Sequence, residues 1–167
     1  MSILRRYHNK GNIYFITNVT YHRKPILVEN IDLIWKSVES VKKKSALEIM
    51  AYVFMPDHFH IIIDPNNEEI SAVLQRLKMS FASLYRARRD MQSGRIWQNR
   101  FWDHIIRNQS DMNRHIDYIH YNPVKHGLVD SPFEWIHSSI RKYREDGYYQ
   151  DDWGKTDKLS FRGEIGE

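Results

Sequence analysis

The sequence predicts one α+β domain, in which amphipathic helices pack on a β-sheet. The chain has 167 residues, about the size of one domain, and 41% of them are hydrophobic, which is enough for a core. Some segments are rich in β-branched and aromatic residues, as strands are. Others repeat apolar residues at helical spacing. We expect a domain over residues 1–145 and a polar C-terminal tail over residues 146–167.

Composition limits the classes of protein that the chain can belong to. A net charge of +4 allows a nucleic-acid partner without requiring one. The absence of cysteine excludes disulfides, thiolate metal sites and cysteine catalysis. The first residues lack the apolar region of a signal peptide, and no apolar run is long enough to span a bilayer. We therefore expect a cytoplasmic protein with no membrane contact.

Strands and helices are predicted in the following order along the chain. They are a strand at 12–21, a helix at 30–44, paired strands at 46–55 and 58–64, a helix at 71–89, two short extended pieces or a bent hairpin at 95–107, and a helix at 108–121. Asn30 is a candidate N-cap for the first helix. Pro123 is expected to end the last helix, because the residue before a proline avoids the α region.

The predicted strand at 58–64 carries two histidines on one face. Alternate strand residues project to the same side, so His58 and His60 lie side by side. Two neutral imidazoles on a rigid strand form half of a divalent metal site. A His-x-His pattern alone, however, more often marks two histidines on a solvated strand face. The rest of the chain has to decide between these interpretations.

The helix at 108–121 carries a polar stripe beside its apolar one. At spacings of i, i+4, i+7 and i+11, the stripe contains Asp111, His115, Tyr118 and Asn122. A helix packed on the sheet could place Tyr118 beside a metal on the two histidines, with the Asn122 oxygen as a third ligand. Such a metal acts as a Lewis acid on a phosphoryl oxygen. Tyrosine is a covalent nucleophile in some enzymes, and its reversible phosphodiester suits cut-and-rejoin chemistry.

Basic and aromatic residues are candidates for DNA contact. A basic helix surface at 71–89 could follow a phosphate backbone, and aromatic rings interleaved with arginines could stack on bases. The alternatives are solubility for the cations and core packing for the rings, and both stay open. The candidates are Arg5, Arg6, Arg86, Arg89, Arg100, Trp102 and Arg107.

Three segments resemble parts of the HUH single-tyrosine transposases, the IS200-like transposases. Residues 55–63 are similar to their His-hydrophobic-His motif, and residues 117–129 are similar to their tyrosine helix. Within that superfamily, residues 97–107 are similar to the REP-associated tyrosine transposases, which are tied to repetitive extragenic palindromes in bacteria. The similarity runs from about residue 7 to residue 143. The order and spacing of the three segments are far more specific than the His-x-His motif alone.

The resemblance implies a ferredoxin-like fold, with helices packed on a central antiparallel sheet. It also implies Mg²⁺ or Mn²⁺ bound by His58 and His60, with Asn122 at a position where relatives use Gln or another polar residue. Tyr118 would attack a phosphodiester of single-stranded DNA beside a palindromic hairpin. The products would be a 5′-phosphotyrosine link and a free 3′-hydroxyl, and attack by a 3′-hydroxyl would rejoin the DNA. Tyr121, three residues on, is the rival nucleophile.

Several features stay open at this level. Asp57 stands where many relatives have Asn, either as a turn residue or as a carboxylate near the metal. His115, His120 and a metal-bound water are all candidate bases for Tyr118. The competing functions are a protein that binds DNA hairpins without cutting them and a small metallohydrolase that does not need Tyr118. The active form is expected to be a monomer or a homodimer.

Overall fold

A four-stranded antiparallel sheet forms the centre of the computed structural model, which describes residues 7, 11–155, 159–161 and 165. The strands are β1 (Tyr14–Val19), β2 (Glu48–Phe54), β3 (His58–Asp64) and β4 (Trp102–Ile105). The α-helices are α1 (Ile31–Lys42), α2 (Ile70–Arg88), α3 (Gln109–Lys125) and α4 (Ile140–Glu145). Short 3-10 helices occur at Tyr21–Arg23, Val28–Asn30 and Pro132–Glu134.

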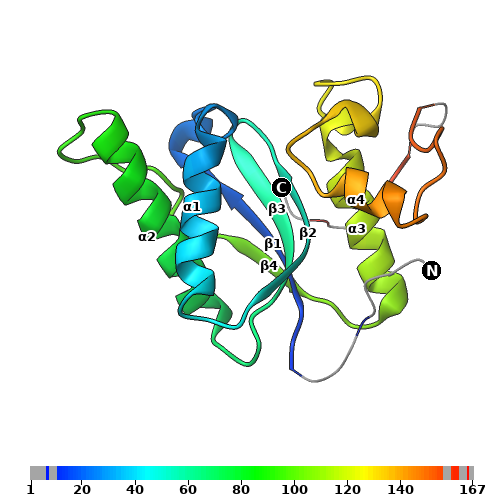
Figure 1. Cartoon of the computed structure of the whole chain (residues 1–167), viewed down its shortest axis with the longest axis horizontal. Helices are drawn as coiled ribbons and strands as arrows, with labels where there is room; N and C mark the ends of the chain where they lie inside the picture. Colours follow the sequence, from blue (N-terminus) through cyan, green and yellow to red (C-terminus); the bar gives the residue numbers. More distant parts are fainter. Residues whose placement is uncertain (1–6, 8–10, 156–158, 162–164, 166–167) are drawn as a thin grey trace.

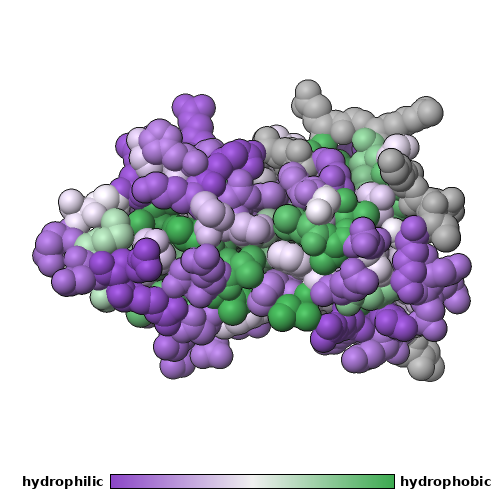
Figure 2. All heavy atoms as spheres, turned by 90° about the horizontal axis from the view of Figure 1, so that it is seen from above, coloured by the Kyte–Doolittle hydropathy of each residue, from purple (hydrophilic) through white to green (hydrophobic). Residues whose placement is uncertain are grey.

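The sheet order β2-β3-β1-β4 follows from a β1-α1-β2-β3-α2-β4 chain path. This is the ferredoxin-like arrangement, so the predicted fold class is confirmed. Helices α1 and α2 cover one face of the sheet, and α3 and α4 lie on the other (Figure 1). Seen from above, hydrophilic residues dominate the outer surface, with hydrophobic residues grouped toward the middle (Figure 2). No helix in the described part of the chain is long and apolar enough to cross a membrane.

Both faces of β3 are buried, which decides where its histidines lie. Phe59, Ile61 and Ile63 pack in the core beneath α1 and α2, as the strand alternation predicted. The opposite face packs beneath α3, where His58 is 4% exposed and His60 is fully buried. The alternative of two histidines on a solvated face is therefore wrong.

The predicted helix and strand ends differ from the structure mainly near Pro123. Helix α3 continues through this proline to Lys125. A proline in the last turn removes one backbone donor, and the carbonyls of Asn122 and Pro123 still accept hydrogen bonds from residues 126 and 128. Gly127 then ends the helix with a φ of +70°. The expectation that Pro123 ends the helix was wrong.

Residues 95–107 form two separate extended pieces, and both lie along β1. Trp97 pairs with Thr20, and Trp102 pairs with Thr17. The first strand stops at Val19, earlier than the predicted residue 21, because His22 and Arg23 adopt positive φ values in a tight turn. A bent hairpin is therefore excluded, and β4 becomes the edge strand next to β1.

Candidate active site

The two strand histidines are each fixed through the Nδ1 atom. The antiparallel register sets Thr17 opposite His60, and the threonine hydroxyl is hydrogen-bonded to His60 Nδ1 at 2.7 Å. His58 Nδ1 bonds Asp57 Oδ1 at 2.6 Å. The two ring centroids are 4.9 Å apart. Histidines that bind metals are held in this way through the other ring nitrogen.

Asp57 is a turn residue whose carboxylate also contacts a neighbouring histidine. It lies in the turn between β2 and β3, and its carboxylate orients His58 and accepts a hydrogen bond from Arg23 at 3.1 Å. Burial opposes ionisation, but the bonds from His58 and Arg23 outweigh it and lower the pKa of Asp57. The carboxylate therefore holds a histidine ring in place.

His60 is neutral and lacks a partner for one nitrogen. Burial lowers its pKa well below the usual value, and the nearby cation of Lys125 lowers it further. Its Nε2 atom is buried and has no hydrogen-bond partner among the described residues. Neutral imidazole is the form that binds metal ions.

Asn122 presents a second set of polar atoms without partners on the same side of the sheet. The residue is fully buried, and neither its Oδ1 nor its Nδ2 has a hydrogen-bond partner in the described part of the chain. A buried amide without partners is costly and calls for an explanation, such as a bound ion or water. With His60 Nε2, the Asn122 oxygen gives a nitrogen and oxygen donor set that fits a divalent cation.

Tyr118 lies next to His60 and one helical turn before Asn122. Its ring centroid is 5.2 Å from that of His60, and Lys125 Nζ donates to its hydroxyl at 3.4 Å. The ring of the rival Tyr121 contacts Trp153 at 6.2 Å and Phe161 at 6.1 Å, and among the described residues it has no ring contact with His58 or His60. The geometry therefore favours Tyr118. Lys125 was missed from the sequence, although its i+7 spacing from Tyr118 places it on the same helix face.

The C-terminal segment encloses the tyrosine. Phe161 lies edge-on against Tyr118, with ring centroids 5.3 Å apart, and Tyr118 is only 1% exposed. Farther along the tail, Ile165 is buried in the core beneath α3. Phe161 is therefore one of the side chains that cover Tyr118.

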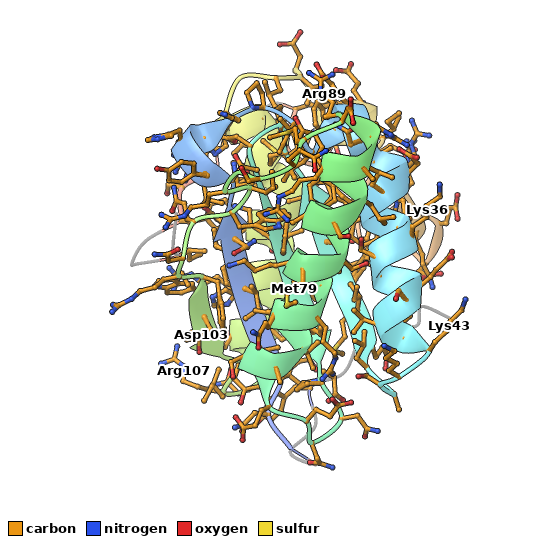
Figure 3. The ribbon with its side chains drawn as sticks, turned by 90° about the vertical axis from the view of Figure 1, so that its left-hand side faces the viewer. Lys36, Lys43, Met79, Arg89, Asp103 and Arg107 are labelled. Carbon is orange, nitrogen blue, oxygen red and sulfur yellow. The ribbon has the colours of Figure 1, made fainter. Side chains whose placement is uncertain are left out.

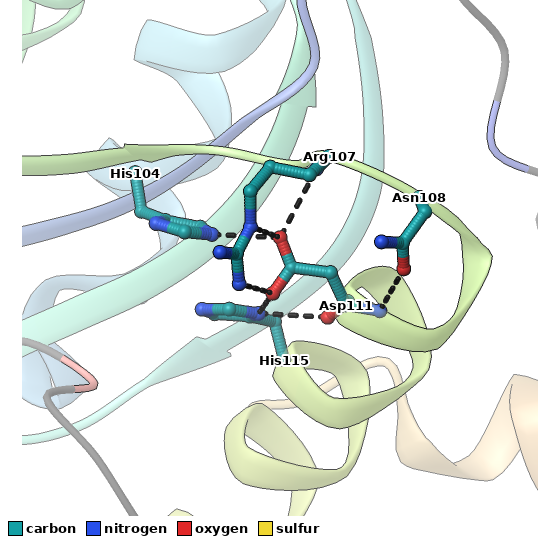
Figure 4. Close-up of polar contacts among 5 residues, drawn as sticks. All are labelled: His104, Arg107, Asn108, Asp111 and His115. Carbon is teal, nitrogen blue, oxygen red and sulfur yellow. Dashed lines mark hydrogen bonds and ion pairs between the residues drawn. The ribbon is translucent and has the colours of Figure 1, made fainter.

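A second cluster joins β4 to the start of α3 (Figure 4). Asp111 Oδ2 accepts from His104 Nε2 at 2.8 Å and from Arg107 Nε at 3.1 Å, and His115 Nδ1 is 3.4 Å from Oδ1. The histidine and aspartate atoms are close enough to hold a metal ion. The guanidinium already neutralises the carboxylate, however, and the two imidazole rings stack 4.6 Å apart. The cluster therefore acts as an ion-pair anchor for the helix.

The candidate general bases differ in what they can do. Both ring nitrogens of His120 are engaged, with Tyr149 Oη at 2.8 Å and Ser139 Oγ at 2.7 Å. Burial lowers the pKa of His120 to about 3. His120 therefore has no free nitrogen to accept a proton. His115 keeps a buried Nε2 without a partner among the described residues, but its Nδ1 bonds the Asp111 carbonyl oxygen at 2.7 Å.

The candidate DNA-binding residues do not converge on one point. Figure 3 shows Arg89 near one end of α2 and Arg107 far from it, below β4. Arg86 donates a hydrogen bond to the carbonyl of Gly94, and Arg107 forms an ion pair with Asp111. Arg100 is exposed just before β4, and Trp102 is half-buried with its ring stacked on His104, 6.1 Å away. Arg5 and Arg6 lie outside the described residues.

Comparisons with known proteins identify the family. Residues 9–122 match the family model for IS200-like transposases. The chain therefore belongs to the IS200-like transposase family, whose members are DNA transposases.

The most informative relatives narrow this class. A Haemophilus influenzae protein assigned to the REP-associated tyrosine transposases is 34% identical over 99% of this chain and 100% of its own length. The Escherichia coli K12 REP-associated tyrosine transposase is 34% identical over 92% of this chain and 91% of its own. A solved REP-associated tyrosine transposase bound to a REP hairpin matches with a TM-score of 0.76 and 32% identity, over 99% of this chain and 100% of its own. The resemblance inferred from the sequence is thus confirmed.

Replacing Asp111 with Asn should weaken the anchor of α3. The loss of a buried carboxylate bonded to His104 and Arg107 is expected to lower the free energy of unfolding by roughly 2–4 kcal/mol. Burial raises the pKa of Asp111, but its hydrogen bonds outweigh this and lower it. The stability difference between wild type and Asp111→Asn should therefore shrink below about pH 4, where the unfolded carboxylate is protonated. Urea unfolding of wild type and variant at several pH values measures the difference in the free energy of unfolding. The exposed Asp103→Asn should change stability little, and an equal loss there would contradict the assignment.

Replacing Asp117 with Asn should stabilise the protein only at high pH. Burial raises the pKa of Asp117 to about 6, against a smaller opposing effect of the Tyr149 hydrogen bond. The folded state therefore holds this proton more tightly, and wild-type stability falls as the pH rises from about 4 to 6. Asp117→Asn should be more stable than wild type by about 2 kcal/mol at pH 8 and equal to it near pH 4. A pH-independent difference in urea unfolding would contradict this origin.

Proposed function

We propose that this chain cleaves and rejoins single-stranded DNA beside REP-like hairpins, with Tyr118 as the nucleophile. We further propose that Mg²⁺ or Mn²⁺ binds at His58, His60 and Asn122. The observation that carries the proposal is the placement of the Tyr118 ring beside the His60 ring, where buried polar atoms of His60 and Asn122 lack partners among the described residues. The hairpin bound to the structural relative supports DNA as the partner.

The chain's own residues prepare the reaction. Thr17 and Asp57 fix the two imidazoles, and burial keeps His60 neutral. The cation of Lys125 lies 5.0 Å from the centre of the Tyr118 ring and donates to its hydroxyl, so it stabilises the phenolate. A bound divalent ion would supply Lewis-acid stabilisation to the scissile phosphate.

The covalent step is a transesterification. The Tyr118 oxygen forms a bond to phosphorus, and the bond from phosphorus to the 3′ oxygen of the preceding nucleotide breaks. The tyrosine loses its proton, and the departing oxygen leaves as a 3′-hydroxyl. Because the number of phosphodiester bonds is unchanged, the reverse reaction can rejoin DNA. All the residues named lie in one chain, so the proposal needs no second copy.

Tyr118→Phe should abolish covalent attachment and leave hairpin binding intact. Labelled single-stranded oligonucleotides with REP-like hairpins, incubated with Mn²⁺, Mg²⁺ or EDTA, should give a protein–DNA adduct on denaturing gels with wild type and with Tyr121→Phe. Without the nucleophile, the rate should fall by about 10³-fold or more. An adduct formed by Tyr118→Phe would refute the assignment. Metal-dependent cleavage without an adduct would indicate a hydrolase, and binding without cleavage would indicate a binding protein.

Direct Mn²⁺ binding distinguishes the two histidine clusters. Free Mn²⁺ has a strong electron paramagnetic resonance signal that disappears on binding. His60→Gln or Asn122→Ala should weaken Mn²⁺ binding by roughly tenfold or more, because each removes a donor atom. His104→Gln changes the anchor cluster and should leave Mn²⁺ binding as in wild type. The opposite pattern would place the ion at Asp111.

A further inference from the structure

An open groove of about 600 Å³ lies between α2 and the segment at residues 95–101. It is on the opposite face of the sheet from Tyr118, because Ile96 and Trp97 belong to the core beneath α1 and α2. A second hollow adjoins it and shares Arg95 and Ile96. The mechanism described above does not use this surface.

Positive charge in the groove is not neutralised. Among the described residues, no acidic side chain lines the groove or the adjoining hollow. The cations that line them are Lys24, Lys78, Arg86, Arg89 and Arg95. None of the five has a carboxylate partner in the described part of the chain, whereas Arg76 and Arg88, also on α2, pair with Glu68 and Asp32. The uncompensated charge on this side of α2 therefore favours an anionic ligand.

Three of these cations are held in place without losing their charge. Lys78 Nζ donates to the carbonyl of residue 98 at 3.0 Å, and Arg86 Nη2 donates to the carbonyl of residue 94 at 2.7 Å. Arg95 lies 4.9 Å from the centre of the Tyr21 ring. Carbonyl and ring partners orient a cation but leave it able to bind phosphate.

The rest of the groove mixes uncharged polar residues with apolar and aromatic ones. Phe101 lines it, and Trp97 is fixed by a 3.0 Å hydrogen bond from its Nε1 to the carbonyl of Lys78. Met79 is 63% exposed on the outer surface of α2 (Figure 3). Cations beside apolar rings suit unpaired nucleotides, whose base faces are free, better than a duplex, whose base faces are stacked. The volume is also that of a small-ligand pocket, too small for a double helix.

We propose that this groove binds a short unpaired stretch of the DNA that carries the hairpin. Phosphates would lie against Lys78, Arg86 and Arg95, and a base would lie against Phe101 and Met79. The edge of the sheet offers a route from the catalytic face: Trp102 contacts Phe15 on that face, and the neighbouring Phe101 lines the groove. The proposal rests on the DNA substrate of the proposed function and adds a second contact site for it.

The test compares a REP-like hairpin that has a single-stranded flank with the same hairpin without the flank. Arg86→Gln/Arg95→Gln should weaken binding of the flanked hairpin by about tenfold. The slope of log K against log salt concentration should become shallower by about 1.4, the value expected for the loss of two single-strand phosphate contacts. Binding of the bare hairpin should stay within about twofold. Lys36→Gln/Lys43→Gln, which removes the same charge from α1 and from the residue that follows it, should behave like wild type on both DNAs.

A second variant tests the apolar part of the groove without a risk to folding. Met79→Glu places a negative charge on an exposed position and should weaken binding of the flanked hairpin alone, whereas Ser40→Glu on the exposed surface of α1 should not. A 2-aminopurine in the flank should lose fluorescence on stacking in wild type but not in Met79→Glu. Equal losses for both DNAs, or no loss for either, would overturn the inference.

The two proposals fail separately. Suppose that wild type forms the adduct and the groove variants bind flanked DNA normally. This result would reject the proposal that the groove binds DNA and would keep the transposase mechanism. Suppose instead that the groove variants lose binding only of the flanked hairpin and that wild type forms no adduct with any metal ion. This result would keep the proposal that the groove binds DNA and would reject the transposase mechanism.

Discussion

The antiparallel register of β1 and β3 is the constraint on which the rest of the structure depends. It sets Thr17 opposite His60, so that a hydroxyl holds the imidazole in one orientation. Side chains alternate along a strand, so a slip of one residue would turn both histidines toward α1 and α2 and bring Phe59 and Ile61 under α3. Both faces are buried, so the slipped pairing would place polar rings in an apolar core. The hydrophobic pattern of β3 therefore fixes the site as firmly as it fixes the sheet.

Features that follow from local periodicity were predictable from the sequence. The placement of His58 and His60 on one face needs only the two-residue repeat of a strand, and the shared face of Tyr118 and Asn122 needs only the helical repeat. The end of α3 was not predictable in this way. Pro123 obeys a local rule that favours ending a helix, but it is buried, and packing keeps the last turn intact.

Features that depend on distant parts of the chain were not predictable. Asp111 and His115 were found as members of a polar stripe, but their partner His104 comes from β4 and is recognised only once the strand and helix are packed together. The role of Asp57 likewise depends on how the turn presents its carboxylate to His58. The contact of Phe161 with Tyr118 joins residues 43 positions apart, and no periodic pattern links them.

Phe15 separates two groups of histidines that would otherwise face each other. Its ring stacks on His60 with centroids 5.5 Å apart and lies 4.8 Å from His115. The phenyl ring has no hydrogen-bonding atoms, so it is an apolar spacer between the imidazole pair on β3 and the His115–Asp111 group. The two sides of Phe15 are therefore distinct: one holds buried donor atoms without partners among the described residues, and the other holds a carboxylate already paired with a guanidinium. A change that weakens the anchor of α3 can therefore leave the hydrogen bonds that orient the two β3 histidines in place.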